Sequence, residues 1–456
     1  MADLAVISGF SPRRLLIADA GLTQGDLLAA AIACQHALPP GRHVVNGCAD
    51  RYHFAVLFLA TLLDARTCLL PASSHPRTLQ QTLIDYPDTV VVTDDGSQGI
   101  SFESLNSALD PAFDPALDWA SDRGRNANPV PVVAGDHVAA LAFTSGSTGS
   151  PRPNRKLWRT LVGTGSWLAQ RFLSDLENPG IVATVPGQHM YGLEMTTMMA
   201  LVGGAVLARG IPFYPRDVSR ALATLTGERV LVTTPVHLRA MVESGLQMPR
   251  CVRVISATAP LSVALARAAE GVFGCQIEEI YGCTEGGSIA TRVTVEDDDW
   301  RLLGHMTLAA GEGGIMLSGE HLPGDVLLED RLQLTADGFR LEGRNADMLN
   351  VGGKRASLGD LSLRLQELSG VDDGVIFLPR NRDSAGRPAA LVVTGLTRQQ
   401  LVRKLHGVMD AEFIPRPVLL VPQIPRNATG KVLNEALQVL FESLPGAANR
   451  EDSGDA

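Results

Sequence analysis

The sequence lacks several features that mark large classes of protein. Its six cysteines form no C-x-x-C pair, and no set of cysteines and histidines has the spacing of a zinc site. We therefore expect free thiols in a reducing compartment. The longest apolar stretch, residues 195–208, contains glycines and is too short to span a bilayer. The first residues do not follow the basic and then apolar layout of a secretory signal. Together these absences predict a soluble, cytoplasmic protein without a membrane span.

An excess of positive charge is also missing. The 456 residues include 39 Lys and Arg against 49 Asp and Glu, which gives a formal net charge of −10. Nucleic acids are bound mainly through clustered cations, so we expect no nucleic-acid partner. The length exceeds that of one typical domain and indicates two or three. A hydrophobic content of 45% is ordinary for a globular protein with a large core.

Short apolar runs alternate with helical patterns over much of the chain. Helical periodicity marks residues 27–38 and 54–65, and strand patterns mark residues 42–49, 89–95, 180–186, 204–209, 229–235, 251–258 and 276–282. Such alternation favours parallel sheets covered by helices. The segment 121–136 is rich in Pro, Asn and Gly and is predicted to be a loop or linker. From about residue 311, two-residue alternation and Asp-Gly turns predict antiparallel hairpins.

We therefore predict a mixed α/β (α+β) fold. A large N-terminal domain, residues 1–343, has parallel sheets covered by helices and a β-rich subdomain. Residues 344–440 again mix helix and strand and are long enough for a small α+β domain. The tail, residues 441–456, is polar and predicted to be disordered.

The stretch LAFTSGSTGSPRPNRK, residues 141–156, places a Thr-, Ser- and Gly-rich loop directly after a strand pattern. Backbone N–H groups in such a loop can surround a phosphate, and a following helix would add its positive end. The loop G-x-x-x-x-G-K-[ST] does not fit, because Pro151 stands where the second glycine is needed. Taken alone, the stretch is also compatible with an ordinary polar turn.

Five polar clusters follow predicted strands. They are FTSGSTG, VPGQHMYG, TTPVH, ISATAP and IYGCTEGG. Ligands of open α/β sheets bind beyond the carboxyl ends of the strands. Each cluster alone is compatible with a simple turn, but the five together favour one shared site.

Four stretches resemble motifs of the adenylate-forming superfamily, which contains acyl- and aryl-CoA synthetases, nonribosomal peptide adenylation domains and luciferases. They are TSGSTGSPR (144–152), IYGCTEGG (280–287), VLLEDRLQLTADGFRLEGRNADMLNVGGKRASLGDL (326–361) and PRNATGK (425–431). They occur in the family's order and cover the chain from about residue 140 to 435. The resemblance implies a two-step reaction. A carboxylate attacks the α-phosphorus of ATP and expels pyrophosphate, and a thiol then displaces AMP from the acyl-adenylate. Catalysis of the first step requires charge to be positioned and neutralised.

The resemblance implies that one set of residues binds ATP: Thr144, Ser145, Gly146, Ser147, Thr148, Gly149, Tyr281, Gly282, Thr284, Asp330 and Arg344. The loop 144–149 is expected to surround the departing phosphates, and Tyr281 to stack against adenine. Thr284 is expected to bond an AMP oxygen. Asp330, seven residues before Asp337-Gly338, is expected to grip the ribose hydroxyls with the help of Arg344.

Two further assignments complete the implied active site. Glu285 resembles the residue that holds Mg²⁺ near the α-phosphate, a role for which a hard cation needs few protein carboxylates. Lys431 resembles the catalytic lysine, carried between carboxylate and α-phosphate by a mobile C-terminal domain; the alternative is a surface lysine after a glycine turn. After adenylation that domain is expected to rotate, so that the turn with Gly353, Lys354 and Arg355 faces the thiol.

Three positions depart from the family pattern. Arg152 stands where the phosphate loop usually has lysine, and Lys156 is expected to share its task. Ala346 stands at the hinge aspartate, with Asp347 next to it, so we expect a shifted or looser pivot. The usual T-G-D is L-E-D at residues 328–330. These changes indicate a divergent branch; a catalytically degenerate nucleotide-binding regulatory protein is the alternative from another class.

The acid substrate is indicated by residues 185–194, VPGQHMYGLE. His189 is expected to contact the carboxylate or a ring, with a structural histidine in a turn as the alternative. Further polar contacts are expected from Gln188, Tyr191, Thr234, His237 and Ser256. So many polar groups favour a small aromatic or hydroxylated acid over a long fatty chain. The motif HMYGLE resembles that of the small AMP-ligases of aryl polyene and xanthomonadin-type pigment clusters. That resemblance implies a 4-hydroxybenzoate-like acid and transfer to the phosphopantetheine of an acyl carrier protein, with free coenzyme A as the alternative acceptor.

Overall fold

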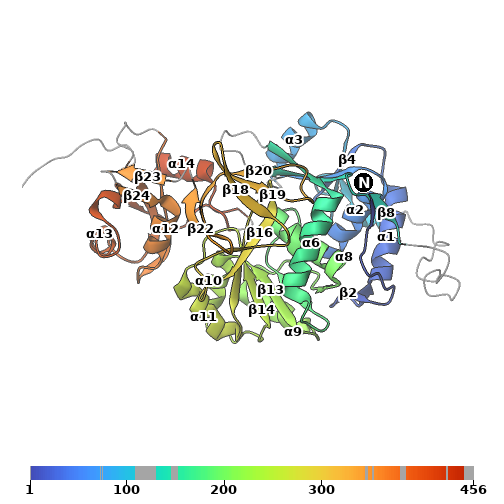
Figure 1. The fold of residues 1–456 in the computed structure, drawn as a ribbon, viewed down its shortest axis with the longest axis horizontal. Helices are drawn as coiled ribbons and strands as arrows, with labels where there is room; N and C mark the ends of the chain where they lie inside the picture. Colours follow the sequence, from blue (N-terminus) through green and yellow to red (C-terminus); the bar gives the residue numbers. More distant parts are fainter. Residues whose placement is uncertain are drawn as a thin grey trace, which may run out of the picture.

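Two large sheets organise most of the chain. The computed structural model describes residues 2–71, 73, 75–107, 130–144, 152–344, 348–351, 354–380, 387–427 and 430–445 (Figure 1). Within these residues, the first sheet has the strand order β10-β9-β5-β4-β6-β7. Its strands are β10 (Arg152–Leu157), β9 (Val138–Thr144), β5 (Thr67–Leu70), β4 (His43–Asn46), β6 (Thr89–Thr93) and β7 (Ile100–Ser101). All neighbours in this sheet are parallel except β10, which pairs antiparallel with β9 at the edge.

The second sheet is larger and has the order β17-β16-β15-β14-β13-β11-β12-β2-β3 in the described chain. Its strands are β17 (Arg301–Leu302), β16 (Gly287–Val293), β15 (Ile277–Cys283), β14 (Arg253–Ser256), β13 (Arg229–Thr233), β11 (Gly180–Ala183), β12 (Val206–Leu207), β2 (Leu15–Ile17) and β3 (Leu22–Thr23). The strands from β15 to β2 are parallel, as the alternation of strand and helix patterns predicts.

Helices connect these strands and cover the sheets. They are α1 (Gln24–Ala37), α2 (Arg51–Leu63), α3 (Pro76–Asp85), α4 (Phe102–Ser107), α6 (Trp158–Leu173), α7 (Met190–Gly192), the π-helix η1 (Leu193–Met198), α8 (Met199–Gly203), α9 (Pro215–Thr224), α10 (Pro235–Glu243) and α11 (Val263–Phe273). Local sequence sets where several of them begin. Thr23 and Asp26 form a reciprocal capping box at α1, and the Asp50 carboxylate accepts two backbone N–H bonds at the start of α2.

The β-rich part that follows consists of hairpins. Its strands are β18 (Thr307–Gly311), β19 (Gly314–Ser318), β20 (Val326–Leu328), β21 (Asp330–Leu334) and β22 (Phe339–Arg344). The pairs β18–β19, β19–β20 and β21–β22 are antiparallel, which confirms the predicted hairpins. The last of these turns at the predicted Asp337-Gly338, where the Thr335 N–H donates to the Gly338 carbonyl.

The C-terminal elements have their own apolar clusters. They are β23 (Met348–Val351), β24 (Lys354–Ser357), α12 (Leu358–Gln366), β25 (Val371–Phe377), β26 (Ala389–Thr394), α13 (Arg398–Leu405), the 3₁₀ turn η3 (Ala411–Phe413), β27 (Val418–Leu420) and α14 (Asn434–Ser443). Two clusters of buried side chains lie entirely within residues 349–441, whereas the main cluster joins elements of both large sheets. In Figure 1 these elements, orange to red, form a lobe at the left of the molecule.

Two boundaries differ from the sequence predictions. Within 121–136, predicted as loop, residues 132–134 form strand β8 (Val132–Ala134), which pairs with the N-terminal β1 (Asp3–Ala5). Local composition does not reveal a partner so far away along the chain. Helix α14 continues beyond residue 440 to Ser443, because Phe441 is buried edge-on against Phe377. Residues 446–456 of the predicted disordered tail lie outside the described residues.

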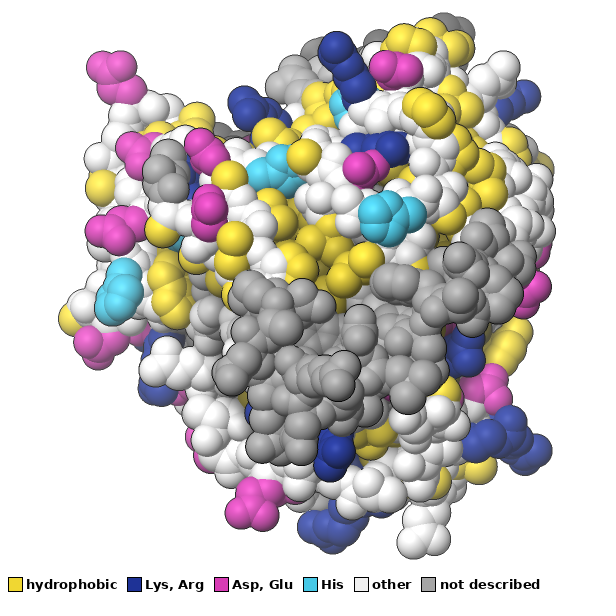
Figure 2. Space-filling model, turned by 90° about the vertical axis from the view of Figure 1, so that its right-hand side faces the viewer, with side chains coloured by type: hydrophobic (Ala, Val, Ile, Leu, Met, Phe, Trp, Pro, Cys, Tyr) yellow, Lys and Arg dark blue, Asp and Glu magenta, His cyan; other side chains and the backbone are white. Residues whose placement is uncertain are grey.

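Side chains of different kinds are mixed over the face of the molecule shown in Figure 2. On the face shown in Figure 2, basic and acidic side chains are interspersed among apolar and neutral ones. In the described part of the chain, no helix is both long and apolar enough to cross a bilayer.

Candidate functional site

Four of the five predicted polar clusters lie at one edge of the larger sheet. They follow β11, β13, β14 and β15, which are consecutive parallel neighbours. The carboxyl ends of these strands therefore point the same way, and the loops that leave them start side by side.

The fifth cluster, the predicted phosphate loop, follows β9 of the other large sheet. Thr144 ends β9 and Arg152 begins β10, and the two residues are partners across the antiparallel ladder. The ends of the predicted loop are thus fixed by strand pairing. Ser145, Gly146, Ser147, Thr148 and Gly149 lie outside the described residues, as do the side chains of Thr144 and Arg152.

Tyr281 and Asp330, predicted at the adenine and ribose, contact each other. The Tyr281 hydroxyl donates to Asp330 Oδ2 at 2.7 Å. The Tyr281 ring is 7% exposed, lies edge-on to Phe339 and is tilted against Trp300. The ring is therefore fixed by packing, and its hydroxyl orients the carboxylate at the end of β15. Arg344, the predicted helper of Asp330, pairs with it across the β21–β22 ladder, although the Arg344 side chain is not among those described.

The turn that follows β15 carries the predicted Mg²⁺ and AMP ligands. Glu285 is exposed and Thr284 is half-buried, so both can reach a ligand. A Cβ at Gly282 would lie 2.4 Å from the Gly287 carbonyl oxygen, so the turn requires glycine there. No group of three or more metal-ligating side chains occurs in the described chain. A single exposed carboxylate suits a hard cation that is bound mainly by phosphate oxygens and water.

The predicted catalytic lysine lies on a tightly bonded turn. The Lys431 N–H donates to Asn427 Oδ1, and the Asn427 N–H donates to the Lys431 carbonyl, each at 2.9 Å. The Arg426 guanidinium donates to the Gly430 carbonyl at 2.7 Å and forms an ion pair with Asp373 at 2.7 Å. These bonds fix the backbone of Lys431 within the C-terminal elements.

This lysine turn contacts the larger sheet at the start of α10. A Cβ at Gly430 would lie 3.2 Å from Val236 Cγ2 and 3.4 Å from Thr234 Oγ1. Gly430 also has φ of +76°, a conformation that favours glycine. The turn therefore approaches the end of β13 closely, where the TTPVH cluster begins.

His189 precedes α7 at the end of the loop that follows β11. Burial, and then the positive charge of Lys431, lower the pKa of His189 to about 4. The loop is tight, because a Cβ at Gly192 would lie 1.9 Å from the Pro186 carbonyl oxygen. The charge of Lys431 thus acts on His189, although the two predicted catalytic residues are far apart in sequence. At neutral pH the His189 ring is uncharged and can donate one hydrogen bond.

The lowered pKa of His189 predicts a pH-dependent stability. A histidine whose folded-state pKa lies below its ordinary 6.5 stabilises the fold above that pH, and this contribution is lost as the pH falls towards 4. We expect the free energy of unfolding to fall by about 1–2 kcal/mol more in the unmodified chain than in His189→Gln between pH 7 and pH 5. Urea titrations at the two pH values measure this difference, and parallel losses in both proteins would contradict it.

Three of the predicted substrate contacts are engaged by neighbouring groups. The Gln188 amide donates to the Cys48 carbonyl at 2.6 Å. The Tyr191 hydroxyl lies within hydrogen-bond distance of two strand-end carbonyls, at 3.2 Å from Thr233 and 2.9 Å from Ile255. Thr234 Oγ1 lies 2.9 Å from His237 Nδ1. In this structure these bonds hold the loops together.

Ser256 differs from these residues. It is the last residue of β14, pairs with Thr233 in the ladder, and its hydroxyl is buried without a hydrogen-bond partner among the described residues. A buried hydroxyl without a partner is costly, and a polar ligand group would satisfy it. Ser256 is therefore the predicted substrate contact that the geometry favours most.

The predicted thiol-acceptor turn is only partly placed. Lys354 and Arg355 begin β24, which pairs with β23, but their side chains are not described. Gly353 lies outside the described residues, and so do Ala346 and Asp347 at the predicted hinge.

Two functional-site residues were not identified from the sequence. Arg51, which is fully buried, donates to the Ala183 carbonyl at 2.6 Å and the Val185 carbonyl at 2.9 Å, and so anchors the start of the His189 loop. Glu194 is buried in η1 and accepts two hydrogen bonds from Ser288. The signal in the sequence was a charged residue beside or within an apolar run, as in RYHFAVLFLA for Arg51 and GLEMTTMM for Glu194.

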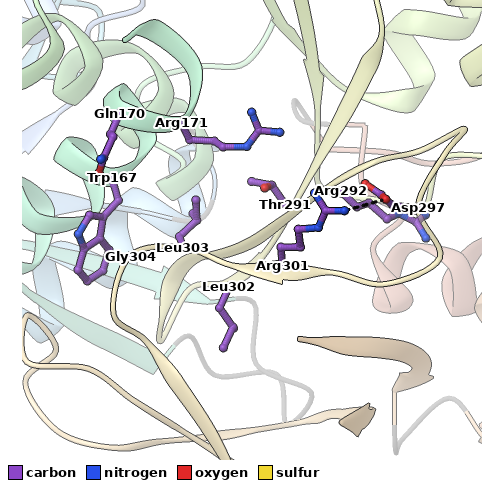
Figure 3. A pocket seen from close by; sticks show the side chains of 10 residues that line it. All are labelled: Trp167, Gln170, Arg171, Thr291, Arg292, Asp297, Arg301, Leu302, Leu303 and Gly304. Carbon is purple, nitrogen blue, oxygen red and sulfur yellow. Dashed lines mark hydrogen bonds and ion pairs between the residues drawn. The ribbon is translucent and has the colours of Figure 1, made fainter. Parts of the chain in front are cut away.

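A separate hollow of about 570 Å³ lies between α6, β16 and β17 (Figure 3). Trp167, Gly304 and three arginines are among the residues that line it. Each arginine has an acidic partner: Arg171 with Glu278, Arg292 with Glu279, and Arg301 with Asp297. None of the predicted nucleotide or substrate residues lines it, so we place the candidate site at the strand ends.

Comparisons with known proteins agree with the motifs. The family model described as AMP-binding enzyme matches residues 23–317. A 4-coumarate–CoA ligase of Halorhodospira halophila is 28% identical over 312 residues, 66% of this chain and 76% of the relative. A 3,4-dihydroxybenzoate–[aryl-carrier protein] ligase of Bacillus anthracis is 23% identical over 319 residues, 67% of this chain and 74% of the relative. Among solved structures, ATP-bound MatB from Rhodopseudomonas palustris has a TM-score of 0.78 at 19% identity and covers 95% of this chain and 97% of its own. This likeness confirms the predicted mixed α/β fold.

Proposed function

As a member of the AMP-binding enzyme family, the chain is an acid-activating ligase that works through an acyl-AMP intermediate, and we propose that its substrate is a small aromatic acid. We propose 4-hydroxybenzoate or a close analogue as the acid, and the phosphopantetheine thiol of an acyl carrier protein as the acceptor. One observation carries the proposal. The lysine turn lies against the start of α10, beside the strand ends that carry His189 and Ser256.

We propose that ATP binds across the ends of β9 and β15. The Tyr281–Asp330 pair supports a ribose site, since the hydroxyl of Tyr281 orients a carboxylate that can accept both ribose hydroxyls. Mg²⁺, held by Glu285 and phosphate oxygens, would neutralise charge at the phosphates. Thr284, half-buried on the same turn, would donate to an α-phosphate oxygen.

Lys431 acts in this proposal as a positioned cation. The carboxylate and the α-phosphate repel each other, and charge accumulates between them as the new P–O bond forms. An ammonium held there stabilises the transition state more than the separated reactants. The charge of Lys431 lowers the pKa of His189, in the loop after β11 where we propose that the acid binds. This effect supports the proposed position of the ammonium.

Gly430 allows Lys431 to reach this position, and Gly430→Ala is expected to show it. The new methyl group would meet Val236 and Thr234. The turn would also hold the alanine at a positive φ, which is unfavourable for a residue with a Cβ. We expect acyl-adenylate formation to slow by about 10- to 100-fold with little change in ATP affinity, because a small displacement of a catalytic group is costly. Gly395→Ala, where a Cβ would meet nothing within 4 Å, is the matched control and should keep the full rate.

The nature of the acid is supported by two observations. The relatives named above are ligases of a hydroxycinnamate and a dihydroxybenzoate. The Ser256 hydroxyl, buried and without a partner in the described chain, would accept or donate one hydrogen bond to a ring substituent. A long alkyl chain would leave that hydroxyl unsatisfied. We propose a role in aryl polyene-type pigment synthesis on the basis of the HMYGLE motif.

The C-terminal elements, residues 344–440, would present the thiol acceptor to the acyl-adenylate. Because their apolar clusters are separate from the main core, we propose that they rotate as one body after adenylation. Rotation would bring Gly353, Lys354 and Arg355 to the thiol. Free coenzyme A is the second candidate, favoured by the CoA-ligase relative. We propose a cytoplasmic location, which the six free cysteines support.

Mass spectrometry of the products separates these acceptors. The full chain is incubated with ATP, Mg²⁺ and 4-hydroxybenzoate, and either holo-acyl carrier protein or coenzyme A is added. We expect the acyl group on the carrier phosphopantetheine. A thioester formed only with coenzyme A would replace the carrier in the proposal, and AMP release without any thioester from a panel of aromatic acids would contradict it.

A further inference from the structure

A buried lysine lies behind the proposed nucleotide site. Lys156 of β10 is 0% exposed, and its ammonium donates to the Glu285 carbonyl oxygen at 2.7 Å. The bond joins the edge strand of the first large sheet to the turn between β15 and β16 of the second. The neighbouring Arg155 is exposed, so strand alternation turns one cation outward and the other inward.

A buried glutamate holds the other end of the same turn. Glu194 Oε2 accepts bonds from the Ser288 backbone N–H at 3.0 Å and from the Ser288 hydroxyl at 2.6 Å. A Cβ at Gly287 would lie 2.5 Å from Glu194 Oε1, so the carboxylate is in close contact with the turn backbone. Glu194 belongs to the π-helix η1, a distortion that is frequent at functional sites.

The two buried charges compensate each other. Burial lowers the pKa of Lys156, and the negative charge of Glu194 opposes this effect. Burial likewise raises the pKa of Glu194, and the bonds from Ser288 and the charge of Lys156 oppose it. A buried charge without a partner is strongly unfavourable. Each of the two groups also bonds the turn that lies between them, Lys156 through the Glu285 carbonyl and Glu194 through Ser288.

We propose that Lys156 and Glu194 are positioning residues that fix the turn of residues 283–288, so that Thr284 and Glu285 face the α-phosphate of the nucleotide. This inference rests on the proposed ATP-binding function. It differs from the expectation that Lys156 shares the phosphate-binding task of Arg152, because the Lys156 ammonium bonds the protein backbone from inside. Its effect on the nucleotide is therefore exerted through the turn.

Binding of AMP and adenosine tests this role without chemistry or metal. Isothermal titration of Lys156→Met is expected to show AMP affinity about tenfold weaker, the loss of roughly one charge-assisted hydrogen bond. Adenosine affinity should stay within about twofold, because only the phosphate contact depends on Thr284. Arg155→Met removes a cation from the adjacent exposed position and should bind both compounds as the unmodified chain does.

A second variant separates positioning from folding. Lys156→Met leaves Glu194 buried without its compensating cation, so we expect a lower melting temperature. Lys156→Met/Glu194→Gln removes both charges and should recover the melting temperature while AMP binding stays weak. Recovery of AMP binding in the double variant, or equal losses for AMP and adenosine, would overturn the positioning role. Unchanged AMP affinity in both variants would also overturn the positioning role. If the unmodified chain binds no AMP, the result would instead refute the proposed ATP-binding function.

Discussion

Replacement of Lys431 by alanine is expected to slow acyl-adenylate formation by about 10²- to 10³-fold, while ATP affinity changes by no more than about twofold. The backbone of Lys431 is fixed by Asn427 and by the Arg426–Asp373 pair, so the variant should keep its fold. The substitution removes the ammonium with its alkyl stem, and in the proposed role the ammonium stabilises the transition state more than the reactants. Single-turnover formation of acyl-AMP, with ATP affinity determined separately, measures the split.

Lys404→Ala is the matched control for this variant. Lys404 is an exposed lysine on α13 of the same C-terminal elements, and its loss should leave the rate unchanged. Thioester formation from added acyl-AMP should be nearly normal in Lys431→Ala, because the proposed rotation would present the turn of Gly353, Lys354 and Arg355 in the second step in place of Lys431. An undiminished adenylation rate in Lys431→Ala would show that another group supplies the cation.

The second large effect is expected at Asp330. Asp330→Asn keeps the size of the side chain but removes the charge that would accept from both ribose hydroxyls. Hydrogen bonds to charged groups contribute about 1.5–3 kcal/mol, so AMP affinity should fall by about 10- to 100-fold. Titration with AMP and with 2′-deoxy-AMP measures both the loss and its origin.

The comparison of the two nucleotides makes this prediction specific. The unmodified chain should prefer AMP over 2′-deoxy-AMP, and Asp330→Asn should lose most of that preference. Asp337→Asn, at an exposed position in the turn of the β21–β22 hairpin, should leave both affinities unchanged. A preference retained in Asp330→Asn would move the ribose contact to a different residue.

Local sequence patterns predicted the framework of the fold. The strands before VPGQHMYG, TTPVH, ISATAP and IYGCTEGG are short apolar runs bounded by turn residues, and they form adjacent parallel strands as expected. The Asp337-Gly338 hairpin was equally clear. These features depend on residues that are close together in the sequence, so local patterns predict them. Strand β8 was missed because its partner, β1, lies at the start of the chain, far from β8 in sequence.

The candidate site was predictable in its parts but not in its internal bonds. The motifs identified Tyr281 and Asp330 separately, yet the bond between them depends on how β15 and β21 meet. Gln188 and Tyr191 were expected to contact substrate, whereas the Gln188 amide bonds the Cys48 carbonyl after β4 and the Tyr191 hydroxyl lies within bonding distance of the Ile255 carbonyl in β14. The inward position of Lys156 could not be read from PRPNRK, because its partner at Glu285 is 129 residues away.

Carboxylate-dependent exchange between ATP and pyrophosphate measures directly whether the chain forms an acyl-adenylate. The full chain is assayed with Mg²⁺ and ³²P-pyrophosphate against a panel of aromatic and aliphatic acids, with no thiol present. We expect exchange that requires an acid and is fastest with small hydroxylated aromatic acids. A chain that binds ATP but shows no acid-dependent exchange with any member of the panel would contradict the proposed function.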